Sequence, residues 1–139
     1  MRDTQPAVSD ENVELVRRGF MASMEEDWPT ALATLDPEVE VLDFDIPDAG
    51  VYRGHDGFLA WLKGWAEGWD SWSVEDIEFR DAGNDHVIAL FKLIAKGAHS
   101  GLELERQDAI TYRIRAGKIV RTEYFNDQLL AREAVGLPD

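Results

Sequence analysis

The hydrophobic pattern of this chain changes its period near residue 70, and few folds accommodate that change. Before this point apolar residues recur at helical spacing, and after it they alternate with polar residues in successive segments. The alternation predicts strands over residues 71–80, 87–96, 102–115 and 118–125. Because short turns join these strands, they form an antiparallel meander, whose strong twist and single apolar face require cover by helices.

The part of the chain before the meander supplies that cover. The expected elements are helices over 9–26 and 28–35, a strand over 39–45, a loop over 46–52, a helix after 53–57 and a short last helix over 127–134. The fold class is therefore α+β: a cone-shaped, strongly curved, mainly antiparallel sheet, with the three helices of the first half on its concave face. Residues 1–8 are expected to form a flexible arm, and residues 9–139 a single domain.

Composition excludes several classes of function. The net charge of −14 repels nucleic acid and anionic membranes, so neither is an expected partner. The chain has no cysteine, which excludes disulfides and thiolate sites, and its three histidines lack metal-like spacing. No metal or cofactor is expected. No apolar run is long enough for a membrane helix or a signal peptide, and a cytoplasmic location is expected.

Strand parity identifies a charged pair on an otherwise apolar face. On the strand over 102–115, Leu104, Ile110 and Tyr112 share one face with Arg106 and Asp108. A charge on the concave face costs several kcal/mol unless it is paired. Two interpretations remain open: the pair closes the cone as a structural ion pair, or it orients a ligand at the mouth of the cone.

Asp43 and Asp108 are the candidate catalytic residues, each as a general base. Strand parity and the apolar stripe of the helix after 53–57 give the rest of the candidate ligand pocket, which comprises Asp45, Phe58, Trp61, Trp65, Phe91, Leu93, Arg106, Ile110, Tyr112, Thr122, Tyr124 and Asn126. The tryptophans follow one helical face, which favours a core role over a cofactor site. The expected ligand is a small hydrophobic molecule.

The convex face of the sheet is expected to be bare. It would present Ile119, Phe125, Ala109 and Thr111 beside charged residues. Paired sheets would cover this apolar part, so the sequence predicts a homodimer through the sheet.

Several short motifs resemble those of one known superfamily. They are Tyr-Arg-Gly-His-Asp-Gly at 52–57, Ser-Gly at 100–101, Gly-Lys-Ile-Val at 117–120, Glu-Tyr-Phe at 123–125 and the closing segment 130–137. Together they resemble the SnoaL-like proteins of the nuclear transport factor 2-like superfamily, which includes polyketide cyclases and relatives of ketosteroid isomerases. The resemblance implies a cystatin-like α+β barrel. It does not imply one reaction, because the superfamily hosts isomerases, cyclases, hydrolases, dehydratases and binding modules.

The resemblance can be followed position by position. Ketosteroid isomerases hold an oxyanion with a tyrosine and an acid, and this chain has Gly19 or Phe20 and Ile110 at those places. Only the aspartate base has a match, in Asp43 or Asp45. Without the two donors, stabilisation of an enolate loses its main contribution, so no steroid isomerase activity is expected.

Two other chemistries of the superfamily are also incomplete. The polyketide cyclases pair an aspartate with a histidine, where this chain has Ile110 and Thr122. Limonene epoxide hydrolases use arginine and two aspartates, where this chain has Phe91, Leu93 and Tyr124, so no epoxide hydrolase activity is expected.

Two hypotheses of function therefore remain. The first is an enzyme of the isomerase, cyclase or hydrolase type that acts on a small, hydrophobic, oxygenated molecule. The second is a non-catalytic binding or dimerisation module. A raised aspartate pKa beside a roomy pocket would favour the first, and a pocket filled by tryptophans would favour the second.

Overall fold

The computed structural model describes residues 8–46 and 50–137, so the expected arm over 1–8 lies outside the described residues except for Val8, where the first helix begins. The elements are α1 (Val8–Met24), α2 (Trp28–Ala33), β1 (Leu35–Asp43), β2 (Val51–Arg53), α3 (Gly54–Glu67), β3 (Trp69–Gly83), β4 (His86–Gly97), β5 (Glu103–Arg115), β6 (Lys118–Phe125) and α4 (Gln128–Ala134). Within the described ranges no helix is both long and apolar enough to cross a membrane.

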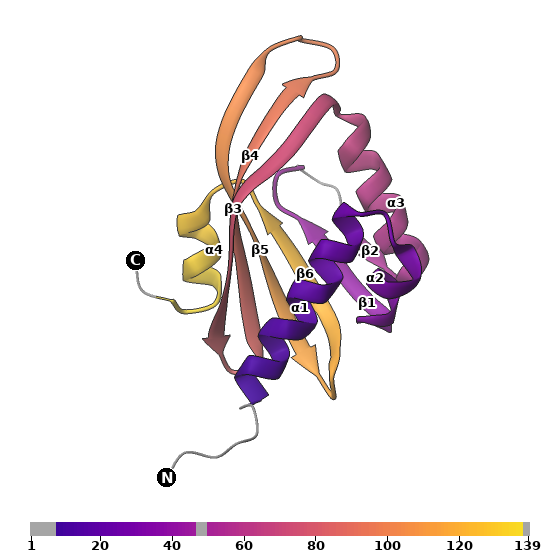
Figure 1. Cartoon of the computed structure of the whole chain (residues 1–139), viewed down its shortest axis with the longest axis vertical. Coiled ribbons are helices and arrows are strands. Elements are labelled where there is room, and N and C mark those ends of the chain that lie inside the picture. The colour runs from indigo at the N-terminus through magenta and orange to yellow at the C-terminus, as the bar shows by residue number, and fades with distance from the viewer. Residues whose placement is uncertain (1–7, 47–49, 138–139) are drawn as a thin grey trace.

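The strands form one sheet in the order β2-β1-β6-β5-β4-β3. All neighbours are antiparallel except β1 and β6, which run parallel. Helices α1, α2 and α3 lie on the concave side of the sheet, and α4 lies on the opposite side (Figure 1). The predicted α+β fold, with three helices from the first half of the chain and a short last helix, is confirmed.

Two tight turns connect the meander. Asn84 and Asp85 join β3 to β4, and Ala116 and Gly117 join β5 to β6; all four residues have positive φ. Positive φ at both positions is the type I′ geometry, whose twist matches that of the strands it connects. The turns therefore continue the sheet's twist from one strand to the next.

Strand β3 bends where its pairing with β4 shifts. The register changes between Glu75 and Glu78, and Asp76 has a φ of 53°. An extra residue of this kind bends the strand and increases its twist.

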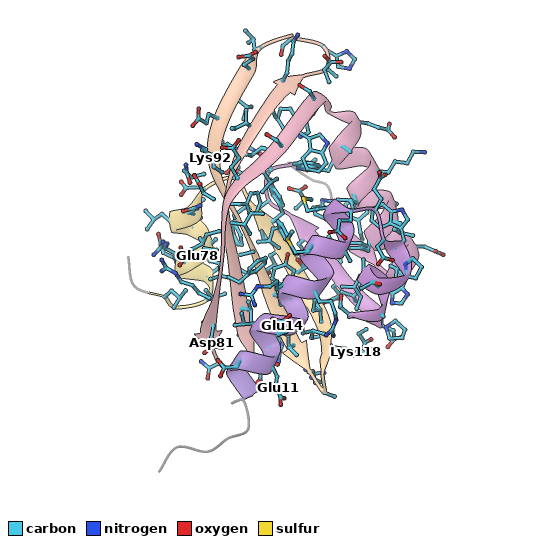
Figure 2. All side chains as sticks on the ribbon, viewed as in Figure 1. Glu11, Glu14, Glu78, Asp81, Lys92 and Lys118 are labelled. Atoms are coloured by element: carbon cyan, nitrogen blue, oxygen red, sulfur yellow. The ribbon has the colours of Figure 1, made fainter. Side chains whose placement is uncertain are left out.

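The outer side of β4 carries Lys92, which lies 3.2 Å from Glu105, as expected for a solvent-facing position. Figure 2 shows Lys92 and Glu78 on the same side of the sheet as α4.

The main core fills the concave side. Val87, Ala89, Phe91 and Leu93 of β4 are all buried in it, which confirms the predicted parity of that strand. The core side chains of α1 and α3 pack against this face, and they include Val16, Phe20, Phe58, Trp61 and Trp65.

The convex side differs from the expectation in two ways. Ile119 is buried in the main core, because the register of β5 and β6 shifts between Arg113 and Ile114 and turns Ile119 inward. Ala109 and Phe125 are buried in a second cluster that includes Ala131 of α4. The chain's own last helix therefore covers much of the apolar surface on which the homodimer prediction was based.

Candidate functional site

Asp108 is the most buried charged side chain of the concave face, with no exposed surface. Its carboxylate accepts two hydrogen bonds from Arg106, at 2.6 Å from Nε and 3.0 Å from Nη2. The hydroxyl of Tyr124 also donates to Asp108. Both carboxylate oxygens are thus occupied, as a buried carboxylate requires.

The charged group continues outward from Arg106 to Asp45 and Asn126. Nη2 of Arg106 lies 3.2 Å from an oxygen of Asp45, and the amide of Asn126 donates to the other oxygen at 2.8 Å. Asp45 and Asn126 follow the ends of β1 and β6, which run parallel and so end at the same edge of the sheet. The side chains of Arg106 and Asp45 are 25% and 21% exposed, so this end of the group reaches solvent.

Asp43 lies beside this group and binds a different partner. One of its oxygens accepts a hydrogen bond from the indole N–H of Trp61 at 2.7 Å, and the other accepts one from the backbone N–H of Asp45 at 2.9 Å. Burial raises the pKa of the Asp43 carboxyl, although both hydrogen bonds oppose the rise. Asp43 is therefore closer to neutrality than an exposed aspartate and suits a role in proton transfer.

A layer of aromatic rings surrounds Tyr124. The ring centroids of Trp61, Trp65 and Phe91 lie 6.0, 6.1 and 6.1 Å from that of Tyr124. Burial raises the pKa of Tyr124, and the negative charge of Asp108 raises it further, so the hydroxyl stays a hydrogen-bond donor.

Next to this layer, the cone contains a small apolar cavity of about 70 Å³. It is lined by Gly19, Phe20, Ser23, Met24, Ala31, Thr34, Phe58, Trp61, Leu62, Ile110, Tyr112 and Ile119. Pockets for small ligands usually have volumes of about 300–1,000 Å³, so aromatic and aliphatic side chains fill most of this interior.

One fully buried donor of the interior lacks a partner. It is the indole N–H of Trp65, which has no hydrogen-bond partner among the described residues. Buried donors are normally satisfied, so this one calls for an explanation. The hydroxyl of Tyr112 also makes no hydrogen bond within the described ranges, and burial of the residue raises its pKa, which keeps the proton on the hydroxyl.

The structure divides the predicted site residues among adjacent sets. Asp45, Arg106, Asp108, Tyr124 and Asn126 form the charged group, with Asp43 beside it, whereas Phe58, Trp61, Ile110 and Tyr112 line the cavity. Trp65 and Phe91 belong to the aromatic layer. Leu93 and Thr122 are buried, but within the described chain they neither line this cavity nor bond to the charged group.

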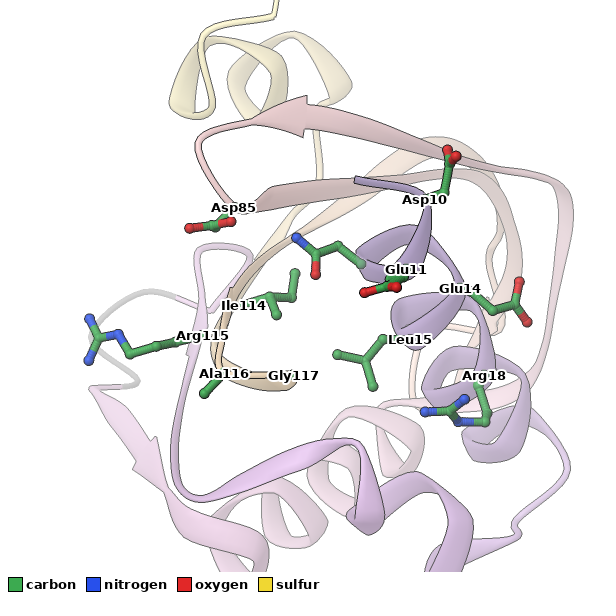
Figure 3. A pocket seen from close by; sticks show the side chains of 11 residues that line it. Asp10, Glu11, Glu14, Leu15, Arg18, Asp85, Ile114, Arg115, Ala116 and Gly117 are labelled. Carbon is green, nitrogen blue, oxygen red and sulfur yellow. The ribbon is translucent and has the colours of Figure 1, made fainter. Parts of the chain in front are cut away.

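Larger hollows lie outside the cone, where the sequence indicated none. One of about 710 Å³ separates the first turns of α1 from the turn between β5 and β6 (Figure 3). A second, of about 700 Å³, lies beside it and shares Arg115 and Ala116 with it. The walls of each hollow come from segments that lie far apart in the chain, residues 10–18 and 114–117 for the first and 36–54 and 113–121 for the second, so no local sequence signal could have identified them. No metal-binding group of three or more acidic or histidine residues occurs in the described ranges.

The two ends of the charged group should respond differently to the loss of one charge. Asp108→Asn removes a buried partner of Arg106 and should lower the free energy of unfolding by about 3–5 kcal/mol. Asp45→Asn removes a charge at the solvent-exposed end of the group and should lower the free energy of unfolding by about 1 kcal/mol or less. Urea unfolding of both variants measures this, and equal losses would contradict the division into a buried and a wet end.

The raised pKa of Asp43 predicts a pH dependence of stability. The folded chain holds this proton more tightly than the unfolded chain does, so the contribution of Asp43 to stability falls as the pH rises from its ordinary pKa of 3.8 through the folded value. The difference in unfolding free energy between the wild type and Asp43→Asn should therefore decrease from about pH 4 upward. Loss of a carboxylate oxygen as hydrogen-bond acceptor also lowers the unfolding free energy of Asp43→Asn, by an amount that does not vary with pH. A difference between the wild type and the variant that stays constant with pH would therefore contradict the prediction.

Comparisons with known proteins agree with this architecture. A nuclear transport factor 2-like protein from Burkholderia thailandensis matches with 29% identity and a TM-score of 0.73, over 88% of this chain and 95% of that one. One from Burkholderia xenovorans matches with 25% identity and a TM-score of 0.72, over 88% and 95%. TerC, co-crystallized with polyporic acid, matches with 18% identity and a TM-score of 0.70, over 91% and 98%.

The search of curated proteins finds no match. The model of the SnoaL-like domain matches residues 16–122, which is most of the chain and runs from α1 into β6. With the cone-shaped sheet and its helical cover, this match shows that the chain belongs to the SnoaL-like domain family.

Proposed function

We propose that this domain binds a small, hydrophobic, oxygenated molecule inside the cone. The observation that carries the proposal is Tyr112, which lines a largely apolar cavity and whose hydroxyl has no hydrogen-bond partner within the described residues. The other two lining hydroxyls, of Ser23 and Thr34, already donate to backbone carbonyls. A hydrogen bond from Tyr112 to a carbonyl or hydroxyl oxygen of a ligand would contribute about 0.5–1.5 kcal/mol. The apolar walls would bind the hydrocarbon part of the same molecule.

The cavity must enlarge to admit such a ligand. Met24, Leu62 and Ser23 are half-buried lining residues, and the first two have flexible side chains. A change of rotamer at Met24 and Leu62 would open the cavity between α1 and α3 without moving the sheet. The unpaired indole N–H of Trp65 is a second donor that a larger ligand would reach.

One similar structure supports this class of ligand. TerC was co-crystallized with polyporic acid, an oxygenated organic molecule, and shares the fold of this chain. The particular reactions of ketosteroid isomerases are not expected here, because Gly19, Phe20 and Ile110 surround the cavity and supply no acid. Epoxide hydrolysis is not expected either, since this chain has Phe91 and Leu93 where limonene epoxide hydrolases have their arginine and first aspartate.

A catalytic role is the second candidate, and Asp43 is the observation that favours it. Its raised pKa suits a general acid or base, and its partner Trp61 lines the cavity. Asp108 suits this role less well, because Arg106 and Tyr124 occupy both of its oxygens. The small volume of the cavity favours the alternative of a binding or dimerisation module without catalysis.

The proposal predicts opposite effects for two conservative substitutions. Tyr112→Phe removes an unpaired hydroxyl, so stability should stay within about 0.5 kcal/mol, whereas binding of an oxygenated ligand should weaken about 2- to 10-fold. Tyr124→Phe removes the donor to Asp108, so stability should fall by about 1–3 kcal/mol. The ligands for the binding measurement would be identified first, by native mass spectrometry of the protein purified from its own host.

Unchanged affinity of Tyr112→Phe for every ligand found would overturn the binding mode. A stability loss equal to that of Tyr124→Phe would show that the hydroxyl of Tyr112 has a structural partner. Turnover of a bound ligand that is abolished by Asp43→Asn would favour the catalytic candidate over the plain binding module.

We also propose that the domain forms a homodimer. The apolar residues that support this proposal differ from those on which the sequence-based prediction was based. Phe44, Leu129 and Leu130 are 55%, 47% and 52% exposed, and the ring of Phe44 stacks on Phe125 at 5.0 Å beside α4. Such side chains would be buried by a second copy of this chain. Light scattering at micromolar concentration should give twice the chain mass of 15.7 kDa, and a monomer would contradict the proposal.

A further inference from the structure

The outer face of the sheet carries a row of charged residues across five strands. His86 of β4 pairs with Arg113 of β5, which pairs with Arg121 of β6, which pairs with Glu40 of β1, which pairs with Arg53 of β2. Residues paired in this way lie side by side on one face. The row therefore contains three arginines and one carboxylate in a chain whose net charge is −14.

The arginines of this row differ in their partners. Arg53 and Arg121 contact Glu40 at 2.6 and 3.2 Å, and Arg121 also contacts Glu123 at 3.0 Å. Within the described ranges, Arg113 has no ion-pair or hydrogen-bond partner from its side chain. Like charges directly opposite each other on neighbouring strands destabilise a sheet. Glu40 and Glu123 offset the charge of Arg121, but within the described ranges no carboxylate contacts Arg113.

Arg115 repeats this pattern two residues further along β5. It lies on the same outer face as Arg113, pairs with Lys118 in the register, and likewise lacks a side-chain partner in the described chain. The amine of Lys118 is bound to the carbonyl oxygen of Ala33 at 2.6 Å. Figure 3 shows the side chain of Arg115 extending away from the labelled side chains of α1.

These residues line a groove of about 700 Å³. Arg53, Arg113, Arg115 and Arg121, four of the chain's ten arginines, lie along it together with Asp36, Glu38 and Glu40. The register shift of β6 places both Val120 and Arg121 in the lining, although consecutive strand residues normally face opposite sides. Bulges often re-aim side chains at functional sites, and this one brings Val120 into the groove beside Arg121, which lies opposite Arg113 in the register.

We propose that this groove binds a small multivalent oxyanion, with Arg113 and Arg115 as its principal ligands and Arg121 beside them. The planar guanidinium forks match the oxygens of phosphate or carboxylate groups, and two arginines on one strand face can hold one dianionic group. The groove lies on the convex side, so the proposal does not depend on the ligand proposed for the cone.

The test is calorimetric titration of the full chain with inorganic pyrophosphate and with citrate. The variant is Arg113→Gln/Arg115→Gln, and the control is Arg17→Gln/Arg80→Gln, which removes the same charge from exposed arginines that already have carboxylate partners. We expect the variant to bind at least about 10-fold more weakly than the wild type, and the control to stay within about 2-fold. The tighter of the two probes identifies phosphate or carboxylate as the preferred group.

A second measurement separates loss of the site from loss of the fold. Removing two arginines that face other cations should leave the thermal midpoint of the free protein unchanged or raise it. Pyrophosphate or citrate should raise the midpoint of the wild type and of the control, but not that of the variant. Failure of the wild type to bind either probe at millimolar concentration would overturn the proposal, as would an equal loss in the control. A dimer that becomes a monomer only in the variant would also overturn it, because a second copy's carboxylates would then be the partners of these arginines.

Discussion

The carboxylate of Asp108 is fully buried in the cone, and the surrounding structure is arranged so that it does not remain unpaired. Arg106 reaches it from the same strand face, and Tyr124 reaches it from the neighbouring strand β6. Arg106 in turn needs a partner for its remaining charge and finds Asp45 beyond the end of β1. One buried charge therefore fixes the relation of three strands, and the parallel pairing of β1 with β6 makes that relation possible.

Around this group the interior is graded from charged to apolar. The ring of Trp61 both donates to Asp43 and lines the cavity, and the other lining side chains are mostly apolar. The hydroxyls of Ser23 and Thr34 in this lining donate to backbone carbonyls, so the proposed binding of an oxygenated ligand depends on the hydroxyl of Tyr112. Burial raises the pKa of Asp43, although the hydrogen bond from Trp61 opposes the rise.

The outer face of the sheet follows a different principle. Its apolar part is buried beneath α4, and its remaining surface is charged. The arginines there concentrate positive charge on an otherwise acidic protein, so the two faces of one sheet differ in their chemistry. The two faces can differ in this way because successive residues of a strand point to opposite sides of the sheet.

Strand parity in the sequence predicted which face of the sheet several candidate site residues occupy. Because side chains alternate strictly in an extended strand, Arg106 and Asp108 could be assigned to the apolar face of β5, and the buried pair confirms this. Where the alternation was interrupted, the prediction failed: the shift in β6 turned Ile119 inward, and no local residue pattern announced it. The start of β1 at Leu35 was also missed, because a buried leucine after a short helix fits either element.

The sequence by itself determined the fold class, the composition of the core and the presence of a charged pair among apolar residues, since these depend on local periodicity. Tertiary structure alone decided that Asp45 and Asn126 join that pair, that the cavity is small, and that four arginines share one groove. Those facts depend on which strand lies beside which and in what register, and the pairing of β1 with β6 joins segments about eighty residues apart. Contacts between such distant segments are set by the packing of the whole domain, which no short stretch of sequence encodes.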